Sequence, residues 1–222
     1  YPLRSKYVRV DSVATKTLNY LDENGKVRSR TQNEQFYLKE GITYTASGSK
    51  GASFRLHPVN SLFDIGGSCV FSRNEYKDYN YLLAFLNSKL AFYILDCLNP
   101  TVNTTQGDIS RIPFVTTNNE IQLKISTLSL LNINYKKNLC HFRLNETSFN
   151  KSPLFFSPEQ ILKVRLVSYL NHENIVSSLI LVNEAIINKL IFELYELSNE
   201  DRAQVESKLG NAIGSYPVTL EA

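Results

Sequence analysis

The hydrophobic pattern of the chain changes its period near residue 115, and this change limits the folds that the chain can adopt. Before that point, short β-type runs alternate with turns rich in glycine and proline. After it, apolar residues recur at steps of three and four, the spacing of an amphipathic helix. The pattern predicts an α+β protein, with a mixed-sheet α/β module over residues 1–115 and a helical spacer or bundle over residues 116–222.

Strand signals dominate the first module. Thr17–Leu21 and Lys26–Arg30 are β-type runs on either side of Asn24-Gly25. An Asn-Gly pair between two such runs favours a tight hairpin, because both residues tolerate positive φ. Three further short strands are expected, over residues 41–45, 53–56 and 68–72.

Helical signals begin at about residue 78. The apolar residues of segment 78–98 lie almost all around the helical wheel, which predicts one buried helix. Further helices are expected over residues 120–131 and from Ser157-Pro158, an N-cap and first-turn pair, to Leu170. An apolar stripe over residues 175–194 predicts a long helix, and a last short helix is expected between a Ser198/Asp201 cap and Gly210.

Between the first helix and the change of period lies the polar segment Asn99–Phe114. It is rich in Asn, Thr, Gln and Gly, and it is expected to close with a short apolar strand that ends at Pro113. Amide and hydroxyl groups place hydrogen bonds well but do little acid–base chemistry at neutral pH. The segment therefore indicates recognition rather than catalysis, with Asp108 as a turn or cap residue.

Composition narrows the class further. The 222 residues are 43% hydrophobic, enough for one sizeable core or two modest ones. No uninterrupted apolar run approaches the roughly 18 residues that span a bilayer, so no membrane partner is expected. Cys69, Cys97 and Cys140 are odd in number and lie among apolar neighbours, which favours reduced core thiols in a cytoplasmic protein. Tyr1 at the start and the lack of methionine suggest a portion of a longer protein without a signal peptide.

Catalytic and metal-binding patterns are missing from the sequence. Gly48-Ser49-Lys50-Gly51 has the wrong spacing for a phosphate-binding loop. The three histidines lie far apart, no Glu-x-Lys accompanies the aspartates, and no nucleophile is indicated. The net charge of +3 has its excess in residues 1–115, where 14 Lys and Arg face 10 Asp and Glu. This mild basic bias is weak support for nucleic-acid binding on its own.

Several segments resemble the target-recognition region of bacterial adenine-specific DNA methyltransferases. They are Gly41-Ile-Thr-Tyr-Thr, Leu62-Phe-Asp-Ile-Gly-Gly, Tyr81-Leu-Leu-Ala-Phe-Leu-Asn-Ser-Lys and the run from Leu98 to Pro113. Residues 145–154 look like the linker that follows this region, and residues 181–197 look like its C-terminal helix. The order is most similar to the BREX phage-defence family (PglX-type), with type I restriction specificity subunits as more distant kin.

The resemblance implies that catalysis belongs to another domain. The family's glycine-rich cofactor loop and Asn/Asp-Pro-Pro-Tyr/Phe tetrapeptide are not found, and Asn99-Pro100-Thr101 matches only the start of the latter. The tryptophans usual in the family's linker are also missing. The chain itself is therefore expected to bind no cofactor, with S-adenosylmethionine held by an N-terminal methyltransferase domain. The expected partners are double-stranded DNA, that domain and other defence-system proteins.

The implied DNA contacts use two kinds of side chain. Amides can bind adenine in a two-pronged way, and guanidinium groups can do the same to guanine, while lysine suits phosphates. The predicted DNA-binding residues are Lys50, Arg55, Arg73, Asn103, Thr104, Thr105, Gln106 and Arg111. The alternative for the arginines is a solvated surface position, and for the polar segment it is a turn that satisfies its own backbone.

A second hypothesis belongs to another class: a protein–protein docking module of a defence complex, with the α/β half as its scaffold. The two hypotheses differ in the surface that they require. DNA recognition needs the cationic residues on one concave face, whereas docking needs a contiguous apolar patch on the last long helix. A standalone nuclease or hydrolase is the third possibility, and no catalytic cluster supports it.

Overall fold

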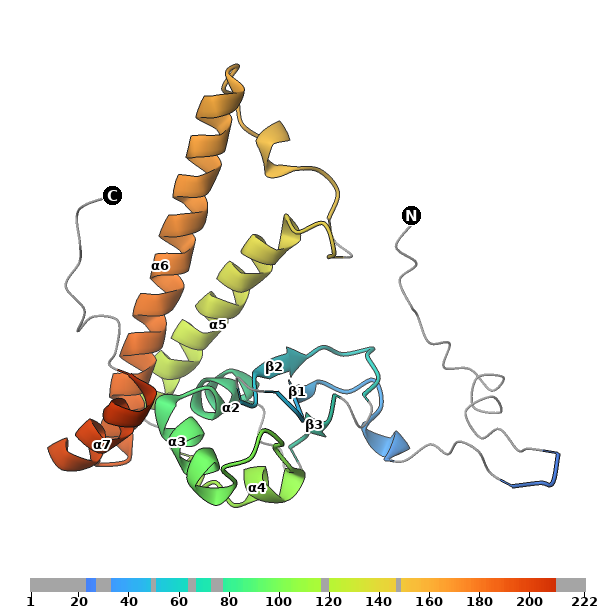
Figure 1. Ribbon diagram of the computed structural model, residues 1–222, viewed down its shortest axis with the longest axis vertical. Coiled ribbons are helices and arrows are strands. Elements are labelled where there is room, and N and C mark those ends of the chain that lie inside the picture. Colours follow the sequence, from blue (N-terminus) through green and yellow to red (C-terminus); the bar gives the residue numbers. More distant parts are fainter. Residues whose placement is uncertain are drawn as a thin grey trace.

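A small antiparallel sheet packs against short helices, and two long helices rise from this base as an arm (Figure 1). The computed structural model describes residues 23–26, 33–48, 51–63, 67–72, 78–116, 120–146 and 149–210. The α+β class is confirmed. Of the hairpin predicted around Asn24-Gly25, only the turn lies among the described residues, with Gly25 at a φ of 71°.

The sheet has the strand order β2-β1-β3, from β1 (Gly41–Tyr44), β2 (Phe54–His57) and β3 (Cys69–Val70). Both pairings are antiparallel, so these strands form no mixed sheet. All three predicted strands are confirmed, although β3 is shorter than expected. Side chains alternate between the two faces: Ile42 and Tyr44 are buried, whereas Arg55, the partner of Thr43, is exposed.

The helix predicted over residues 78–98 is two helices, α2 (Tyr79–Leu86) and α3 (Lys89–Leu98), which meet at a bend of 60°. Ser88 begins α3 by accepting a hydrogen bond from Ala91 N at 3.2 Å. The prediction of a single helix was wrong because a strong N-cap, Ser88, lies inside the apolar run.

Asn87, at the bend, ties the helices to the sheet. Its amide pairs with Phe54 as a neighbouring strand would: Nδ2 donates to Phe54 O at 3.0 Å, and Oδ1 accepts from Phe54 N at 3.2 Å. Nδ2 also donates to Leu83 O at 3.2 Å. One side chain thus caps α2 and satisfies an edge position of β2.

The polar segment ends differently from the prediction. Thr105 caps a short helix, α4 (Gln106–Ser110), and the following residues up to Pro113 form no strand. They are fixed instead by two phenols. Tyr195 donates to Pro113 O at 2.7 Å and accepts from Val115 N at 3.2 Å, and Tyr81 donates to Val115 O at 2.8 Å.

These phenols belong to an aromatic hub of Tyr81, Phe85, Phe114 and Tyr195. Phe85 is fully buried, and its ring stacks on Tyr195 with centroids 5.5 Å apart and an interplanar angle of 6°. Phe114 lies 5.4 Å from both Phe85 and Tyr81. The hub joins α2, the segment after α4 and the end of the longest helix.

The arm consists of α5 (Glu120–His141) and α6 (Leu162–Leu194), which diverge away from the sheet (Figure 1). α5 is longer than predicted, and the predicted start at Ser157 is wrong, since Ile161 precedes the first turn of α6. The two helices expected over 157–170 and 175–194 are one, because no glycine or proline interrupts residues 171–174. Asn183 of α6 donates to Asn132 of α5 at 2.8 Å.

The last helix, α7 (Asn199–Leu209), starts as predicted, with a reciprocal cap between Ser198 and Asp201 and with Gly210 at its end. The core is continuous across residue 115: Ile42, Phe85, Ile125, Ile191 and Val205 belong to one buried cluster. The domain boundary at residue 115 stays a prediction.

Of two expectations from composition, the lack of a membrane partner stays a prediction, and the burial of all three cysteines is wrong. By length and composition, α6 could cross a membrane, since an 18-residue window of it has a mean hydropathy of 1.7, and so could α2 and α3 if the bent pair is one span. The core helices of soluble proteins can have the same length and composition, so this is weak support for a span. The three cysteines are free, but Cys97 is exposed and not a core thiol.

Replacing Asn87 tests the link between sheet and helices. Asn87→Ala leaves both backbone groups of Phe54 without their partner, so we expect the free energy of unfolding to fall by about 1–3 kcal/mol. Urea denaturation measures the loss. Asn171→Ala, at an exposed position of α6, is the matched control and is expected to change it by less than about 0.5 kcal/mol. Equal effects of the two substitutions would contradict this role of Asn87.

Candidate nucleic-acid interface

The polar segment from Asn99 to Arg111, here called the recognition loop, is fixed to the end of the sheet by its backbone. Gly48 N donates to Val102 O at 3.0 Å, and Thr104 N donates to Ala46 O at 2.9 Å. A bridge pairs Ser47 with Asn103 between these two bonds. Residues 46–48 follow β1 closely, so the loop continues the sheet beyond the end of that strand.

Asn99 holds the recognition loop in shape from inside. Its Nδ2 donates to Asp108 Oδ2 and to Asn103 O, each at 2.9 Å. Its Oδ1 accepts from Thr101 Oγ1 at 2.7 Å and from Thr101 N at 3.2 Å. All the hydrogen-bonding groups of the Asn99 amide are thus engaged within the loop.

Asp108 is a cap residue, as predicted. It forms a reciprocal capping box with Thr105, whose N and Oγ1 donate to Asp108 Oδ2 at 2.9 and 2.8 Å. The hydrogen bond from the Asn99 side chain, followed by those from Thr105, lowers the pKa of the Asp108 carboxyl, and the charge of Arg111 adds to this effect. The carboxylate therefore stays ionised, and its negative charge lies beside a cationic residue.

The loop divides the predicted contact residues into two groups. Thr104 serves the loop through its backbone, since Thr104 N donates to Ala46 O, and the Thr105 side chain serves it through the capping box. The side chains of Asn103, Gln106 and Arg111 are exposed and, within the described part of the chain, hydrogen-bond to nothing. These three side chains are available to an external ligand.

Arg55 lies on the outer face of the sheet, next to the loop. Its Nη1 donates to Thr45 Oγ1 at 3.0 Å and to Ser53 O at 3.2 Å. Thr45 directly precedes Ala46, which accepts the hydrogen bond from Thr104. Arg55 therefore lies close to the recognition loop, because it contacts Thr45 and the next residue, Ala46, contacts the loop. The exposed guanidinium of Arg55 has further N–H groups that can donate to a ligand.

Lys50 and Arg73, the other two predicted contacts, lie outside the described residues. The glycines beside Lys50 are described: Gly51 N donates to Gly48 O at 3.2 Å. Gly51 has a φ of 76°, and a Cβ there would lie 3.3 Å from the Phe92 ring. Both observations favour glycine at this turn.

The chemistry of the site is that of hydrogen-bonding recognition. It offers free amides at Asn103 and Gln106 and guanidinium groups at Arg55 and Arg111. Among the described residues, no group of three or more His, Cys, Asp or Glu is placed to hold a metal ion. Such donors on a rigid loop match the edges of nucleic-acid bases and their phosphates.

Sequence reasoning missed two asparagines: Asn99, which holds the recognition loop, and Asn87, which ties the sheet to the helices. A signal for the loop was present, since Thr105-x-x-Asp108 is the capping-box pattern that begins α4. No local pattern predicted the role of Asn87, because its partner Phe54 lies 33 residues earlier in the chain.

Comparisons with known proteins place the chain beside adenine-specific methyltransferases. It is 27% identical over 208 residues to the adenine-specific methyltransferase BrxX of Escherichia coli O9:H4 (strain HS), an alignment covering 90% of this chain. It is 34% identical over 91 residues to the adenine-specific methyltransferase PglX of Lacticaseibacillus casei (strain Zhang), covering 41% of this chain. No protein-family model matches the chain.

These similarities support a relation to the BREX-type methyltransferases. The chain is much shorter than its relatives: the aligned regions span 16% of BrxX and 8% of PglX. The relation to a defence-system methyltransferase therefore concerns a small part of those proteins.

The capping box makes a testable prediction about ionisation. Because Asn99 is the main cause of the shift, the Asp108 carboxyl should titrate below the ordinary aspartate value of about 3.9, and Asn99→Ala should raise its pKa. The sign follows from linkage: the loop is stabilised above the ordinary pKa and loses this stabilisation as pH falls through the lowered one. Carbon-13 NMR of the carboxyl group measures both values. An Asp108 that titrates normally, or that ignores Asn99→Ala, would contradict the network.

Proposed function

We propose that this chain recognises duplex DNA as the specificity region of an adenine-N6 DNA methyltransferase in a phage-defence or restriction-modification system. The observation that carries the proposal is the recognition loop, where Asn103, Gln106 and Arg111 are exposed on a segment locked by Asn99 and Asp108. The relation to BrxX and PglX, both named adenine-specific methyltransferases, supports it.

The proposed role fits the physical demands of the reaction. An enzyme that methylates adenine in a duplex must turn the base out of the stack, so another region must hold the flanking DNA in register. Asn103 and Gln106 would read adenine edges, and Arg55 and Arg111 would bind guanine or phosphates. Because Asn99 fixes the loop before binding, little conformational entropy is lost when DNA docks.

Catalysis is assigned to another part of a longer protein. In this proposal S-adenosylmethionine binds to a methyltransferase domain outside the chain, and the chain contributes no catalytic residue. The proposed location is the cytoplasm, where the DNA target is found.

Binding to a labelled duplex, selected from a randomised pool and followed by fluorescence anisotropy, tests the proposal. Affinity should fall linearly with salt on a logarithmic scale, and Arg55→Ala or Arg111→Ala should reduce the slope by about one. Asn103→Ala should cost about 1–3 kcal/mol and relax the choice of base at one position.

The chain offers matched controls for both kinds of substitution. Arg143→Ala and Asn145→Ala change the same residue types at exposed positions beyond α5, away from the loop. They should leave affinity and selectivity unchanged. Binding to the duplex that does not depend on salt, or no detectable binding at low ionic strength, would contradict the DNA-recognition role.

A specific observation also favours the second hypothesis, protein docking. The inner face of α6 carries Val176 and Ile180, which are buried against α5. Val164, Ile175 and Val182, spaced by three and two helical turns, form an outer stripe that is 40–61% exposed. A helix that is apolar on two faces indicates a second packing partner, and we propose that the methyltransferase domain covers the outer stripe.

Co-expression with the polypeptide encoded directly upstream tests this docking role. The two should co-elute in gel filtration, and the double variant Ile175→Asp with Val182→Asp should separate them, because burying two carboxylates without partners is costly. Leu123→Asp, at a 69% exposed position of α5, is the control. Docking through the outer stripe fails if the double variant co-elutes as the wild type does.

A further inference from the structure

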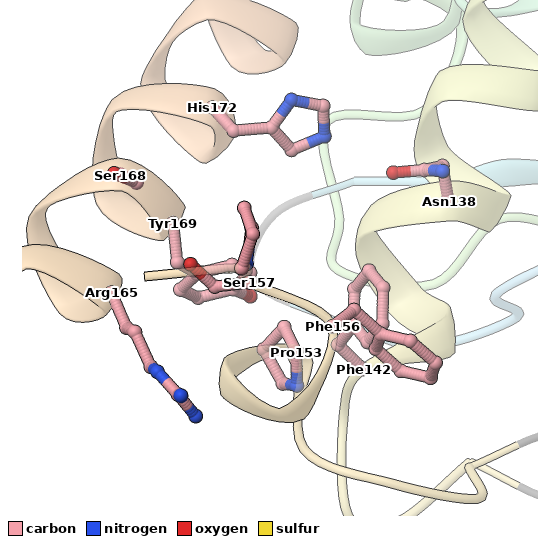
Figure 2. Close-up of a pocket in the computed structure, with 10 residues that line it drawn as sticks. Asn138, Phe142, Pro153, Phe156, Ser157, Arg165, Ser168, Tyr169 and His172 are labelled. Atoms are coloured by element: carbon pink, nitrogen blue, oxygen red, sulfur yellow. The ribbon is translucent and has the colours of Figure 1, made fainter. Parts of the chain in front are cut away.

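A pocket of about 340 Å³ lies at the far end of the arm, where α5 and α6 have diverged. Figure 2 shows its walls: Asn138 from α5, Phe142 directly after the end of α5, Phe156 from the connecting segment, and Tyr169 and His172 from α6. We call it the tip pocket. Neither the recognition loop nor the outer stripe of α6 contributes a residue to it.

The tip pocket is built by specific contacts. Arg165 of α6 fixes the connecting segment, with Nη1 donating to Leu154 O at 3.3 Å and Nε donating to Glu159 O. Phe142 meets Phe156 at a centroid distance of 6.3 Å and meets Tyr169 edge to face at 6.1 Å. The end of α5, the connecting segment and α6 are thereby joined around one aromatic surface.

Two polar side chains face each other across the mouth of the pocket. His172 points from α6 towards α5, and Asn138 lies opposite (Figure 2). Within the described residues, neither side chain forms a hydrogen bond, so both are available to a ligand. The pocket thus combines an apolar floor with convergent donors, the usual composition of a binding site.

The surroundings of the pocket favour a protein over a nucleic acid. Leu144, Phe155, Ile161 and Leu162 flank its lining residues in the sequence, and each is at least 65% exposed. Exposed apolar side chains in such number mark protein interfaces, whereas surfaces that bind nucleic acids are predominantly polar.

The net charge around the tip pocket indicates the charge of the partner that it would attract. Residues 136–173 contain six Lys and Arg and three Asp and Glu, a net charge of +3. Residues 174–210 contain three Lys and Arg and six Asp and Glu, a net charge of −3. The tip of the arm is therefore a cationic end of the helical half, and it would attract an acidic partner.

We propose that the tip pocket binds an acidic peptide segment of a partner protein through one apolar anchor side chain. The anchor packs on Phe142, Phe156 and Tyr169, while Asn138 and His172 donate hydrogen bonds to the backbone or a carboxylate of the peptide. This site goes beyond DNA recognition and does not depend on it, because the two sites share no residue.

The test uses a fluorescein-labelled octapeptide with Trp-Leu at its centre and Asp and Glu on both sides, followed by anisotropy with the whole chain. We expect saturable binding that is lost when lysines replace the acidic residues or Gly-Gly replaces Trp-Leu. Asn138→Ala and Phe156→Ala should each weaken binding at least about fivefold, within the range for truncated contact residues.

Asn134→Ala, one turn earlier on α5 and also exposed, is the matched control and should bind like the wild type. Asn138 and Asn134 make no hydrogen bond within the described residues, so neither substitution is expected to unfold the chain. Undetectable binding, equal binding of the lysine peptide, or insensitivity to Asn138→Ala would overturn the proposal. Displacement of the peptide by a single-stranded oligonucleotide would assign the pocket to nucleic acid and overturn it as well.

Discussion

The stacking of Phe85 on Tyr195 is the contact on which the rest of the structure depends. It joins the central helix α2 to the end of α6, and it leaves the Tyr195 hydroxyl free to hold Pro113 and Val115. The same aromatic hub therefore fixes both the base of the arm and the exit from the recognition loop. Burial raises the pKa of the Tyr195 phenol, so this hydroxyl stays protonated and able to donate at neutral pH.

From this hub the molecule extends in two directions with different chemistry. On one side, the sheet and the recognition loop are polar and locked by short networks, of which Asn99 and Asp108 form the centre. On the other side, α5 and α6 leave the core and present apolar surface at the outer stripe and around the tip pocket. A polar recognition loop at one end and an apolar arm at the other suit a protein that binds DNA through the loop and protein through the arm, as we propose.

The sequence predicted the features that local chemistry decides. Strand patterns located β1 and β2, and the Ser198 cap located α7, because these signals need only neighbouring residues. Features that depend on distant partners were missed. The tie from Asn87 to Phe54 of the sheet joins residues 33 positions apart, and the late start of α6 is stabilised by the bonds from Arg165 to the connecting segment. The break between α2 and α3 itself follows a local signal, the Ser88 cap, which the apolar pattern around it obscured. In the candidate site, Asp108 was recognised as a cap, whereas the role of Asn99 was not.

We propose that the exposed amides of the recognition loop, Asn103 and Gln106, contact DNA, while the amide of Asn99, engaged within the loop, does not. Side-chain amide signals in nitrogen-15 NMR distinguish these groups directly during titration with a selected duplex. We expect shifts for Asn103 and Gln106 and a nearly constant signal for Asn99. Unchanged signals for Asn103 and Gln106 on a duplex that does bind, with shifts confined to Asn138 at the tip of the arm, would contradict it.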